Sequence, residues 1–343
     1  MKKTRRIFVL LYSFLALSII TALTLTLIFE NEGTTAYAST SPKDKKITVL
    51  IAGLDEAAEN TDVLMLATLQ SGREAAVLQI PRDTYVKTDL YEGKINHLYR
   101  ACVEKYGNKS GAEEYLKRIS DLFGISVDRY AIFTGKNLED LVNTVGGVTL
   151  EVPFAFTYTD GDGKNRSVGE GKQHLDGSDA LAYVRYRSAY AEGDLGRLDA
   201  QMRFIAALTK QLLEERSLRT YFRIYQKNYR NLLTNVTEKD IINIIQDHLA
   251  GKADKDGSSL RLMRLPGEAC RGNEGAWYYV LNKNGAAEML ARFFGGTAPL
   301  DFDKAGRFVR RDREAFLNIY NAKGYECRIY SLDEAAKAQV LHK

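Results

Sequence analysis

The chain has 343 residues, of which 45% are hydrophobic, so it is long enough for one large domain or two smaller ones around a buried core. Its formal net charge of +4 equals the charge of the four basic residues that precede position 7, which leaves the rest of the chain neutral. A neutral body argues against a non-specific nucleic-acid-binding protein, whose folded domain normally carries a basic face. The 3 cysteines are too few for a disulfide scaffold, although Cys270 and Cys327 are able to pair in an oxidising compartment.

An apolar stretch without charges follows the basic N-terminus and predicts a transmembrane anchor over residues 7–29. A bilayer is crossed by about 20 such residues, and the positive-inside rule places residues 1–6 in the cytoplasm. The alternative is a cleaved signal peptide, since the small-residue pattern at 36–38 resembles a cleavage site, but the apolar run exceeds a signal core of roughly 7–15 residues. We therefore expect a single-pass cell-membrane protein with an extracytoplasmic linker over 30–46, a catalytic domain over 47–296 and a C-terminal extension over 297–343.

Three short apolar runs bounded by turn residues predict strands at 47–54, 62–69 and 74–80. A tight hairpin turn at Ser71-Gly72 makes a three-stranded meander the natural arrangement. In a meander the first strand ends, the second begins and the third ends at the same edge of the sheet. Chain order alone then gathers four charged residues at that edge: Asp55, Asp62, Arg82 and Asp83. The alternative for the first two is an ordinary role as turn residues at strand ends.

The remaining pattern alternates between helices and strands and predicts an α/β layered domain. The stretch 160–171 lacks the ligands of a calcium loop, and we expect it to be a surface loop. Capping boxes are predicted for two helices, from Ser110 with Glu113 and from Thr237 with Asp240. We expect helices at 95–106, 112–123, 138–145, 198–215, 238–249, 286–294 and 310–321, and strands at 129–133, 148–152, 260–265, 277–281 and 325–330.

The segment 173–201 holds three closely spaced arginines, Arg185, Arg187 and Arg197. The first two are two positions apart, so in an extended segment they point the same way. Asp194 is able to cap a following helix, on which Gln201 shares a face with the arginine four positions before it. Guanidinium groups that repel one another predict an anionic ligand such as a phosphate or carboxylate. An equally weighted alternative is a salt-bridge network with the nearby aspartates Asp176, Asp179, Asp194 and Asp199.

Several common catalytic motifs are missing from the sequence, including a phosphate-binding glycine loop, a zinc-binding His-Glu-x-x-His and a nucleophile elbow. His97 and His174 lie beside the stretches of interest, but a structural role is favoured for each. The remaining carboxylates and arginines, together with Lys94, suit a magnesium-bridged pyrophosphate. Mg²⁺ takes one or two carboxylates plus phosphate oxygens, and arginines stabilise the charge that develops on a leaving phosphate.

Seven short motifs occur in a specific order and spacing: Gly-Leu-Asp at 53–55, Thr-Asp-Val-Leu-Met-Leu at 61–66, Ile-Pro-Arg-Asp-Thr at 80–84, Lys-Ile-Asn-His at 94–97, Gly-Gly-Val at 146–148, Tyr-Val-Arg-Tyr-Arg at 183–187 and Gly-Asp-Leu-Gly-Arg at 193–197. Each motif is weak alone, but their combination resembles the LytR-CpsA-Psr family of exported cell-wall ligases. The resemblance runs from about residue 47 to the helix after 201, and more weakly to 277–279. The tail after about residue 297 matches nothing in the family.

The resemblance implies an α/β fold, with a central mixed β-sheet flanked by helices and an apolar pocket for a polyprenyl chain. It implies a Mg-dependent phosphotransferase that moves a glycopolymer phosphate from a polyprenyl pyrophosphate carrier to peptidoglycan, forming a phosphodiester. By the same resemblance, Asp55 and Asp62 match metal-binding positions. The positions implied to be catalytic are Asp62, Asp83, Arg82, Arg185 and Arg197, and those implied to bind the pyrophosphate are Arg82, Lys94, Arg185, Arg187, Arg197 and Gln201.

Two positions depart from the family pattern. Asn60 stands where an arginine often precedes the second aspartate, and Ala200 stands where a second arginine usually follows Gly-Arg. The missing positive charges favour an alternative function, a non-catalytic module that binds a polyprenyl lipid or a glycopolymer and regulates cell-wall assembly. Regulation of nucleic acid through the arginines is a third hypothesis, which the export signal and the neutral body oppose.

Overall fold

The computed structural model describes residues 46–69, 75–191, 193–214, 223–224, 226–229, 232–237, 240, 260–296, 307–308 and 314–337. The predicted transmembrane anchor, the turn at Ser71-Gly72 and all but one residue of the predicted helix 238–249 lie outside these ranges. Within them, no helix combines the length and the apolar character needed to cross a membrane.

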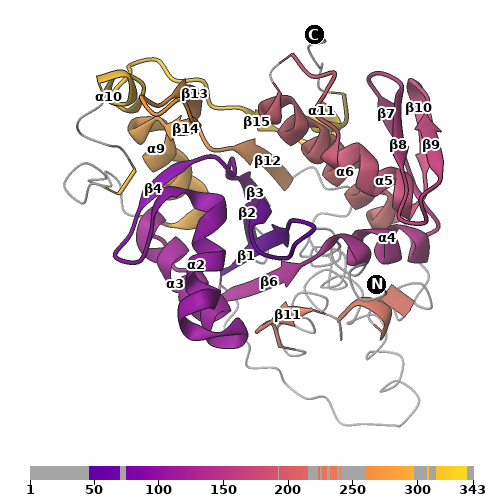
Figure 1. Cartoon of the computed structure of the whole chain (residues 1–343), viewed down its shortest axis with the longest axis horizontal. Helices are drawn as coiled ribbons and strands as arrows, with labels where there is room; N and C mark the ends of the chain where they lie inside the picture. The colour runs from indigo at the N-terminus through magenta and orange to yellow at the C-terminus, as the bar shows by residue number, and fades with distance from the viewer. Residues whose placement is uncertain are drawn as a thin grey trace, which may run out of the picture.

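Seven described strands form one mixed sheet at the centre of the domain (Figure 1). Their bounds are β1 Ile47–Leu54, β2 Thr61–Leu69, β3 Ala75–Gln79, β6 Arg129–Phe133, β11 Leu233–Thr234, β12 Leu260–Arg264 and β15 Ile329–Tyr330. The order across the sheet is β11-β6-β1-β2-β3-β12-β15. β2 pairs antiparallel with both β1 and β3, so the predicted meander is confirmed. The pairs β1–β6 and β3–β12 are parallel.

Helices cover both faces of this sheet, which is why its central strands are apolar at nearly every position. Successive side chains point to opposite faces: Val49 and Ile51 of β1 enter one hydrophobic cluster, whereas Leu50 and Ala52 enter the other. In Figure 1 the two groups of helices lie on opposite sides of the sheet. The first cluster includes α4 Gly135–Thr144, α5 Gly177–Arg185, α6 Asp194–Glu214 and α11 Leu332–Lys337, and the second includes α2 Leu98–Tyr106, α3 Asn108–Phe123, α9 Lys283–Phe294 and α10 Glu314–Tyr320.

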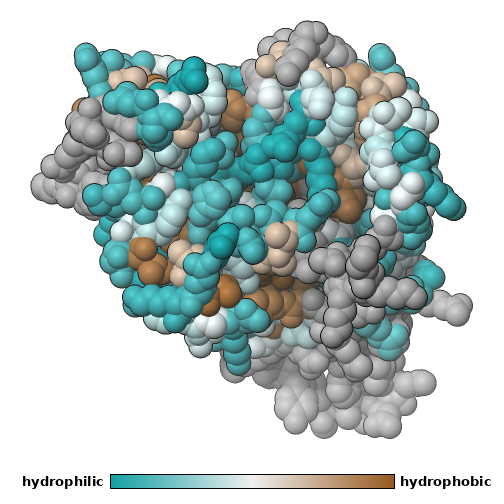
Figure 2. Space-filling model, viewed as in Figure 1, coloured by the Kyte–Doolittle hydropathy of each residue, from teal (hydrophilic) through white to brown (hydrophobic). Residues whose placement is uncertain are grey.

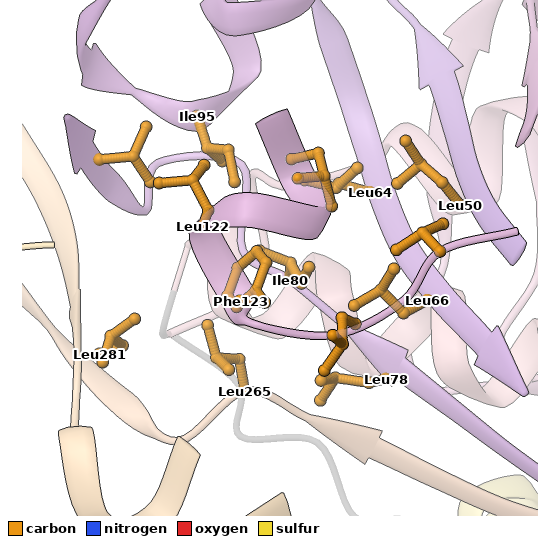
Figure 3. Close-up of a cluster of buried hydrophobic side chains, with 14 of the residues drawn as sticks. Leu50, Leu64, Leu66, Leu78, Ile80, Ile95, Leu122, Phe123, Leu265 and Leu281 are labelled. Carbon is orange, nitrogen blue, oxygen red and sulfur yellow. The ribbon is translucent and has the colours of Figure 1, made fainter. Parts of the chain in front are cut away.

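The second cluster shows how strand and helix residues meet. In Figure 3 the leucines of β1, β2 and β3 project toward Leu122 and Phe123 of α3. Leu50, Leu66 and Phe123 are all 0% exposed. Each such side chain contributes roughly 1.5–3 kcal/mol by leaving water, so this packing fixes the sheet against the helices.

Four pairs of short strands lie outside the central sheet within the described residues. One of these pairs shows that a prediction from the sequence was wrong. The stretch 160–171, expected to be a loop, contains the turn and the second strand of a β-hairpin, because a tight turn at Asp160–Gly163 lets the chain reverse. The two-stranded sheets are β4 Tyr85–Lys87 with β5 Glu92–Lys94, β7 Val148–Val152 with β10 Gly171–Leu175, β8 Phe156–Thr159 with β9 Asn165–Val168, and β13 Gly267–Arg271 with β14 Trp277–Leu281. A 3-10 turn, η1 Ile95–His97, follows β5.

Helix boundaries differ from the predicted ones where capping was misjudged. The capping box expected from Ser110 and Glu113 is wrong, because α3 already begins at Asn108. The predicted glycine stop is confirmed, since Gly124 adopts a left-handed φ of 60° after α3. The Thr237–Asp240 contacts of the other predicted box are present, with Asp240 N–H donating to Thr237 Oγ1 at 3.2 Å.

Residues beyond 296 add to the same domain. β15 pairs antiparallel with β12, and Phe316 and Tyr320 of α10 are 0% exposed in the second hydrophobic cluster. Part of the expected extension 297–343 therefore completes the sheet and the core. Cys270 and Cys327 are both free, so the disulfide considered from the sequence is not formed.

Candidate active site

The predicted edge of the sheet exists, and it brings charged residues from the start of β2 and the end of β3 together. Leu54 pairs with Thr61 across the first two strands, and Ile80 N–H donates to Leu64 O at 2.8 Å after β3. Arg82 Nη1 lies 2.5 Å from Asp62 Oδ1, and both side chains are about one-fifth exposed. Beside them, Lys94 Nζ lies 3.0 Å from Asp83 Oδ1.

Asp194, the first residue of α6, is the carboxylate around which the arginines converge. Its Oδ1 lies 2.9 Å from Arg197 Nη2, 3.4 Å from Arg82 Nη2 and 3.7 Å from Arg187 Nη1. Arg197 Nη2 also donates to the backbone oxygen of Asp62 at 3.4 Å. The start of α6 is thereby joined to the start of β2, and three arginines share the charges of Asp62 and Asp194.

The Gly-Asp-Leu-Gly-Arg motif has a structural basis in this junction. Gly193 has φ +57°, a left-handed conformation that glycine adopts without strain. A Cβ at Gly196 would come within 2.5 Å of the Tyr190 side chain, so only glycine lets α6 approach that ring. These two glycines place Asp194 and Arg197 on the first turn of the helix.

Arg185 and Arg187 do not share an extended segment, and that expectation was wrong. Arg185 is the last residue of α5, and the chain turns to extended backbone only at Tyr186. Arg185 Nη1 donates to Glu56 Oε1 at 2.6 Å, which connects α5 to the β1–β2 loop. Arg187, by contrast, turns toward Asp194 and keeps 52% of its side chain exposed.

The alternative prediction, a salt-bridge network between the arginine cluster and four nearby aspartates, is confirmed only in part. Of its four aspartates, Asp194 pairs with Arg187 and Arg197 of the cluster. The other three pair elsewhere: Asp176 and Asp179 with Arg166, and Asp199 with Arg264 and Arg328. Around Asp194, three guanidinium groups therefore face two carboxylates, which leaves an excess of positive charge for an anion.

Two buried N–H donors in this cluster also lack a hydrogen-bond acceptor in the described part of the chain. They are Nε of Arg82 and Nε of Arg197. An unsatisfied buried donor costs about 1–3 kcal/mol, and more when the group is charged. Both donors therefore add to the cost of gathering these arginines at one place.

Burial and neighbouring charges act in opposite directions on the pKa values here. Burial lowers the pKa of Arg197; Asp194 opposes this effect and Arg82 strengthens it. At Arg82, burial also acts to lower the pKa, but Asp194 and Asp62 raise it overall. Burial is the main cause of the lowered pKa of Arg185, against the charges of Glu56 and Asp62. All three guanidinium groups remain cations, since arginine is not deprotonated in proteins.

Asp55, the other expected metal ligand, accepts hydrogen bonds from residues of the β1–β2 loop. Its Oδ1 accepts from Glu59 N–H at 3.0 Å and its Oδ2 accepts from Asn60 Nδ2 at 2.8 Å. Burial acts to raise the pKa of Asp55, but these hydrogen bonds lower it overall. Asn60 Oδ1 lies 2.8 Å from His97 Nδ1, so the position where the family often has an arginine links the loop to η1.

Gln201, expected to bind pyrophosphate, lies inside the domain and is 2% exposed. Its Oε1 accepts from Gln79 Nε2 at 2.9 Å, and its Nε2 donates to Val184 O at 3.2 Å. These bonds hold the end of β3 and the last turn of α5 against α6. Two contacts were not predicted from the sequence: the hydrogen bond from Gln79 to Gln201 and the ion pair between Glu56 and Arg185. Neither contact has a local sequence signal.

Magnesium stays a prediction at this edge of the sheet. Mg²⁺ takes one or two carboxylates plus phosphate oxygens, and the carboxylates of Asp62 and Asp194 are both paired with arginines in this structure. Within the described residues, no group of three or more His, Cys, Asp or Glu side chains is placed to hold a metal. Asp62 and Asp55 remain the predicted ligands.

The surface around the site is largely hydrophilic. Figure 2 shows hydrophilic residues over the centre of the face seen in Figure 1, with hydrophobic residues in small separate groups. A cavity of about 1010 Å³ borders Arg185, and its lining is mostly polar and charged. The apolar pocket for a polyprenyl chain stays a prediction.

A mixed sheet covered by helices on both faces defines an α/β domain, and its arginines and carboxylates gather at one edge of that sheet. A family model described as the LytR_cpsA_psr family matches residues 24–294, and the chain belongs to this family. The resemblance seen in the sequence motifs is confirmed.

Among relatives, the chain is 29% identical over 206 residues to the polyisoprenyl-teichoic acid–peptidoglycan teichoic acid transferase TagV of Bacillus subtilis. The match covers 57% of this chain and 51% of TagV. The chain is 27% identical over 252 residues to the transferase of the same description, TagU, of Bacillus anthracis, which spans 70% of this chain and 75% of TagU. The chain thus spans about half the length of TagV.

Solved structures share the fold. The structure of TagT bound to LIIa-WTA superposes with a TM-score of 0.56 at 26% identity, over 76% of this chain and 95% of that one. The structure of B. subtilis TagV superposes with a TM-score of 0.60 at 24% identity, over 75% of this chain and all of that one, and shows the fold alone.

Proposed function

We propose that this protein is an exported, membrane-anchored phosphotransferase that moves a glycopolymer phosphate from a polyprenyl pyrophosphate carrier to peptidoglycan. The observation that carries the proposal is the convergence of Arg82, Arg187 and Arg197 on Asp62 and Asp194, with two buried guanidinium N–H groups unsatisfied. A pyrophosphate supplies the oxygens that such groups bind. The names of TagV and TagU, teichoic acid transferases, support the choice of reaction.

In the proposed reaction, a sugar hydroxyl attacks the phosphorus that carries the glycopolymer. A new P–O bond forms, the bond to the bridging oxygen breaks, and polyprenyl phosphate leaves. Arg82, Arg185 and Arg197 stabilise the negative charge that develops on the leaving group. The hydroxyl proton passes to Asp62 or Asp83, each already held in place by a cation. Mg²⁺, when bound, supplies further charge neutralisation beside the phosphates.

The test measures transfer with the purified extracytoplasmic part, a polyprenyl pyrophosphate-linked saccharide and peptidoglycan. Arg185→Ala is expected to lower the rate about 10²–10³-fold, the loss typical when one charge-stabilising donor is removed. Arg292→Ala, on the exposed side of α9, is the matched control and is expected to transfer at the wild-type rate. If Arg185→Ala transfers as fast as wild type, the assigned site is wrong.

The alternative, a binding module that regulates wall assembly, makes a different prediction. It requires that the protein bind the polyprenyl lipid or the glycopolymer without turnover at any Mg²⁺ concentration. Ala200 is one of the two departures from the family pattern that favour the binding module, and it is 0% exposed in the first hydrophobic cluster. A magnesium titration of the transfer assay therefore decides between the two functions, and also tests the proposed dependence on magnesium.

A further inference from the structure

The cavity beside Arg185 has a volume of about 1010 Å³, large enough for a sugar chain of more than one unit. Its walls come from α4, α5, the β8–β9 hairpin and the loop after β1. In Figure 1, α4, α5 and the β8–β9 hairpin lie together on the right of the view, away from α2, α3 and α9, and the loop after β1 lies nearer the centre. The lining residues are Glu56, Gly135, Lys136, Glu139, Asn143, Tyr158, Thr159, Asp160, Gly161, Asp162, Arg166, Asp176, Ser178, Leu181, Ala182, Arg185 and Tyr186.

The cations in the lining already have carboxylate partners. Lys136 Nζ lies 2.8 Å from Asp140 Oδ1, and Arg166 Nη2 lies 2.8 Å from Asp176 Oδ2. Arg185 is paired with Glu56. Five carboxylates and three cations line the cavity, so its charge is negative overall. A polymer with many phosphate groups is repelled by such walls, whereas the hydroxyl groups of a neutral saccharide find acceptors there.

Two half-buried tyrosines add apolar surface to this polar lining. The Tyr186 ring is stacked on Phe156 with centroids 4.7 Å apart, and Tyr158 OH donates to Asp179 Oδ1 at 2.7 Å, so both rings are held in place. Leu181 and Ala182 of α5 add further apolar side chains to the lining. Fixed aromatic faces among hydrogen-bonding groups suit the alternating apolar and hydroxyl surfaces of a sugar ring.

Arg185 belongs to both the cavity and the candidate active site. Its guanidinium group lines the cavity, and its pKa is affected by the charge of Asp62 at the edge of the sheet. Arg185 is therefore the residue at which the cavity adjoins the candidate active site.

We propose that the cavity binds the acceptor, a neutral saccharide chain whose hydroxyl group attacks the phosphate, rather than the phosphate-rich donor polymer. This inference rests on the proposed function for its chemistry. Leu181→Trp fills the cavity from α5, and Glu139→Gln removes one acceptor charge without changing the shape of the side chain. Leu116→Trp on α3, whose side chain is also partly buried, is the matched control.

The experiment measures binding by calorimetry with three probes: a neutral chain of N-acetylglucosamine units, a phosphate-containing glycopolymer and inorganic pyrophosphate. Leu181→Trp is expected to weaken glycan binding about tenfold or more, a typical loss when shape complementarity in a pocket changes. Glu139→Gln is expected to weaken it less, and both variants are expected to bind pyrophosphate as wild type does. Circular dichroism of each variant verifies that it folds.

Three outcomes overturn the inference. Wild type does not bind the glycan, wild type and Leu181→Trp bind it equally well, or Leu181→Trp weakens binding of a phosphate-containing glycopolymer and leaves glycan binding unchanged. The proposed function fails separately. If Leu181→Trp weakens glycan binding but wild type transfers nothing at any magnesium concentration, the saccharide site stands and the phosphotransferase assignment falls.

Discussion

At the scale of single residues, Asp194 decides the charge of the candidate site. It contacts Arg82, Arg187 and Arg197, and the last of these keeps only 3% of its side chain exposed. The sequence analysis treated Asp194 as a helix cap or as one of four neutralising acids. Its position shows instead that one carboxylate holds three guanidinium groups close together, at separations that would otherwise be repulsive.

Asp194→Asn keeps the size of the side chain and removes its charge. We expect unfolding free energy to fall by about 3 kcal/mol, because a nearly buried guanidinium group loses its main counter-ion. Pyrophosphate is then expected to raise the melting temperature more in Asp194→Asn than in wild type, since the anion replaces the lost charge. Thermal unfolding with and without pyrophosphate measures both effects. An equal shift in the two proteins would show that the anion does not bind at these arginines.

At the scale of elements, the β1–β2 loop is fixed by a chain of side chains from Asp55 through Asn60 to His97. Burial is the main cause of the lowered pKa of His97, with Lys94 and Arg100 acting in the same direction. The folded state therefore binds this proton less readily than the unfolded state, whose histidine keeps the ordinary value of 6.5. The stabilising contribution is complete above that value and is lost as pH falls through the lower pKa of the folded state.

His97→Gln removes the titrating group while keeping a side chain able to bond to Asn60. Between about pH 8 and about pH 5, we expect the stability of wild type to fall more than that of His97→Gln. The difference should stay below about 1 kcal/mol, because solvent screens a partly exposed ring. Urea unfolding at each pH measures it. A steeper loss of stability in His97→Gln than in wild type would contradict the assigned direction.

At the scale of the whole molecule, stability comes from two hydrophobic clusters on opposite faces of one sheet rather than from cross-links. All three cysteines, Cys102, Cys270 and Cys327, are free. Residues from 314 onward add β15 to the sheet and α11 to the first cluster, so both ends of the described chain contribute to one core.

We therefore expect the melting temperature to be the same with and without a reducing agent. Alkylation of the denatured protein, without prior reduction, should label all three thiols, and the mass of the product counts the labels. A product carrying a single label, together with a lower melting temperature after reduction, would instead indicate a disulfide between two of them. Cys102→Ala serves as a control, because it lowers the expected count by one.

The sequence by itself determined the meander of β1, β2 and β3 and hence the edge that holds Asp62 and Arg82. Both rest on short-range physics: alternation of side chains along a strand and the tendency of turn residues to end it. The sequence also identified the family, because ordered motifs need no knowledge of contacts. Local patterns were less reliable near glycines, as the strand found at 165–168 in an expected loop shows.

Which charged side chains meet depends on how the helices pack on the sheet. Arg185 is 129 positions from its partner Glu56, and Arg197 is 135 positions from the backbone oxygen of Asp62 that it contacts. The packing of α5 and α6 on the sheet sets these pairs, and no local pattern encodes where the end of a helix meets the end of a strand. For the same reason, the paired cations of the cavity and its excess of acceptors became visible only in the folded chain.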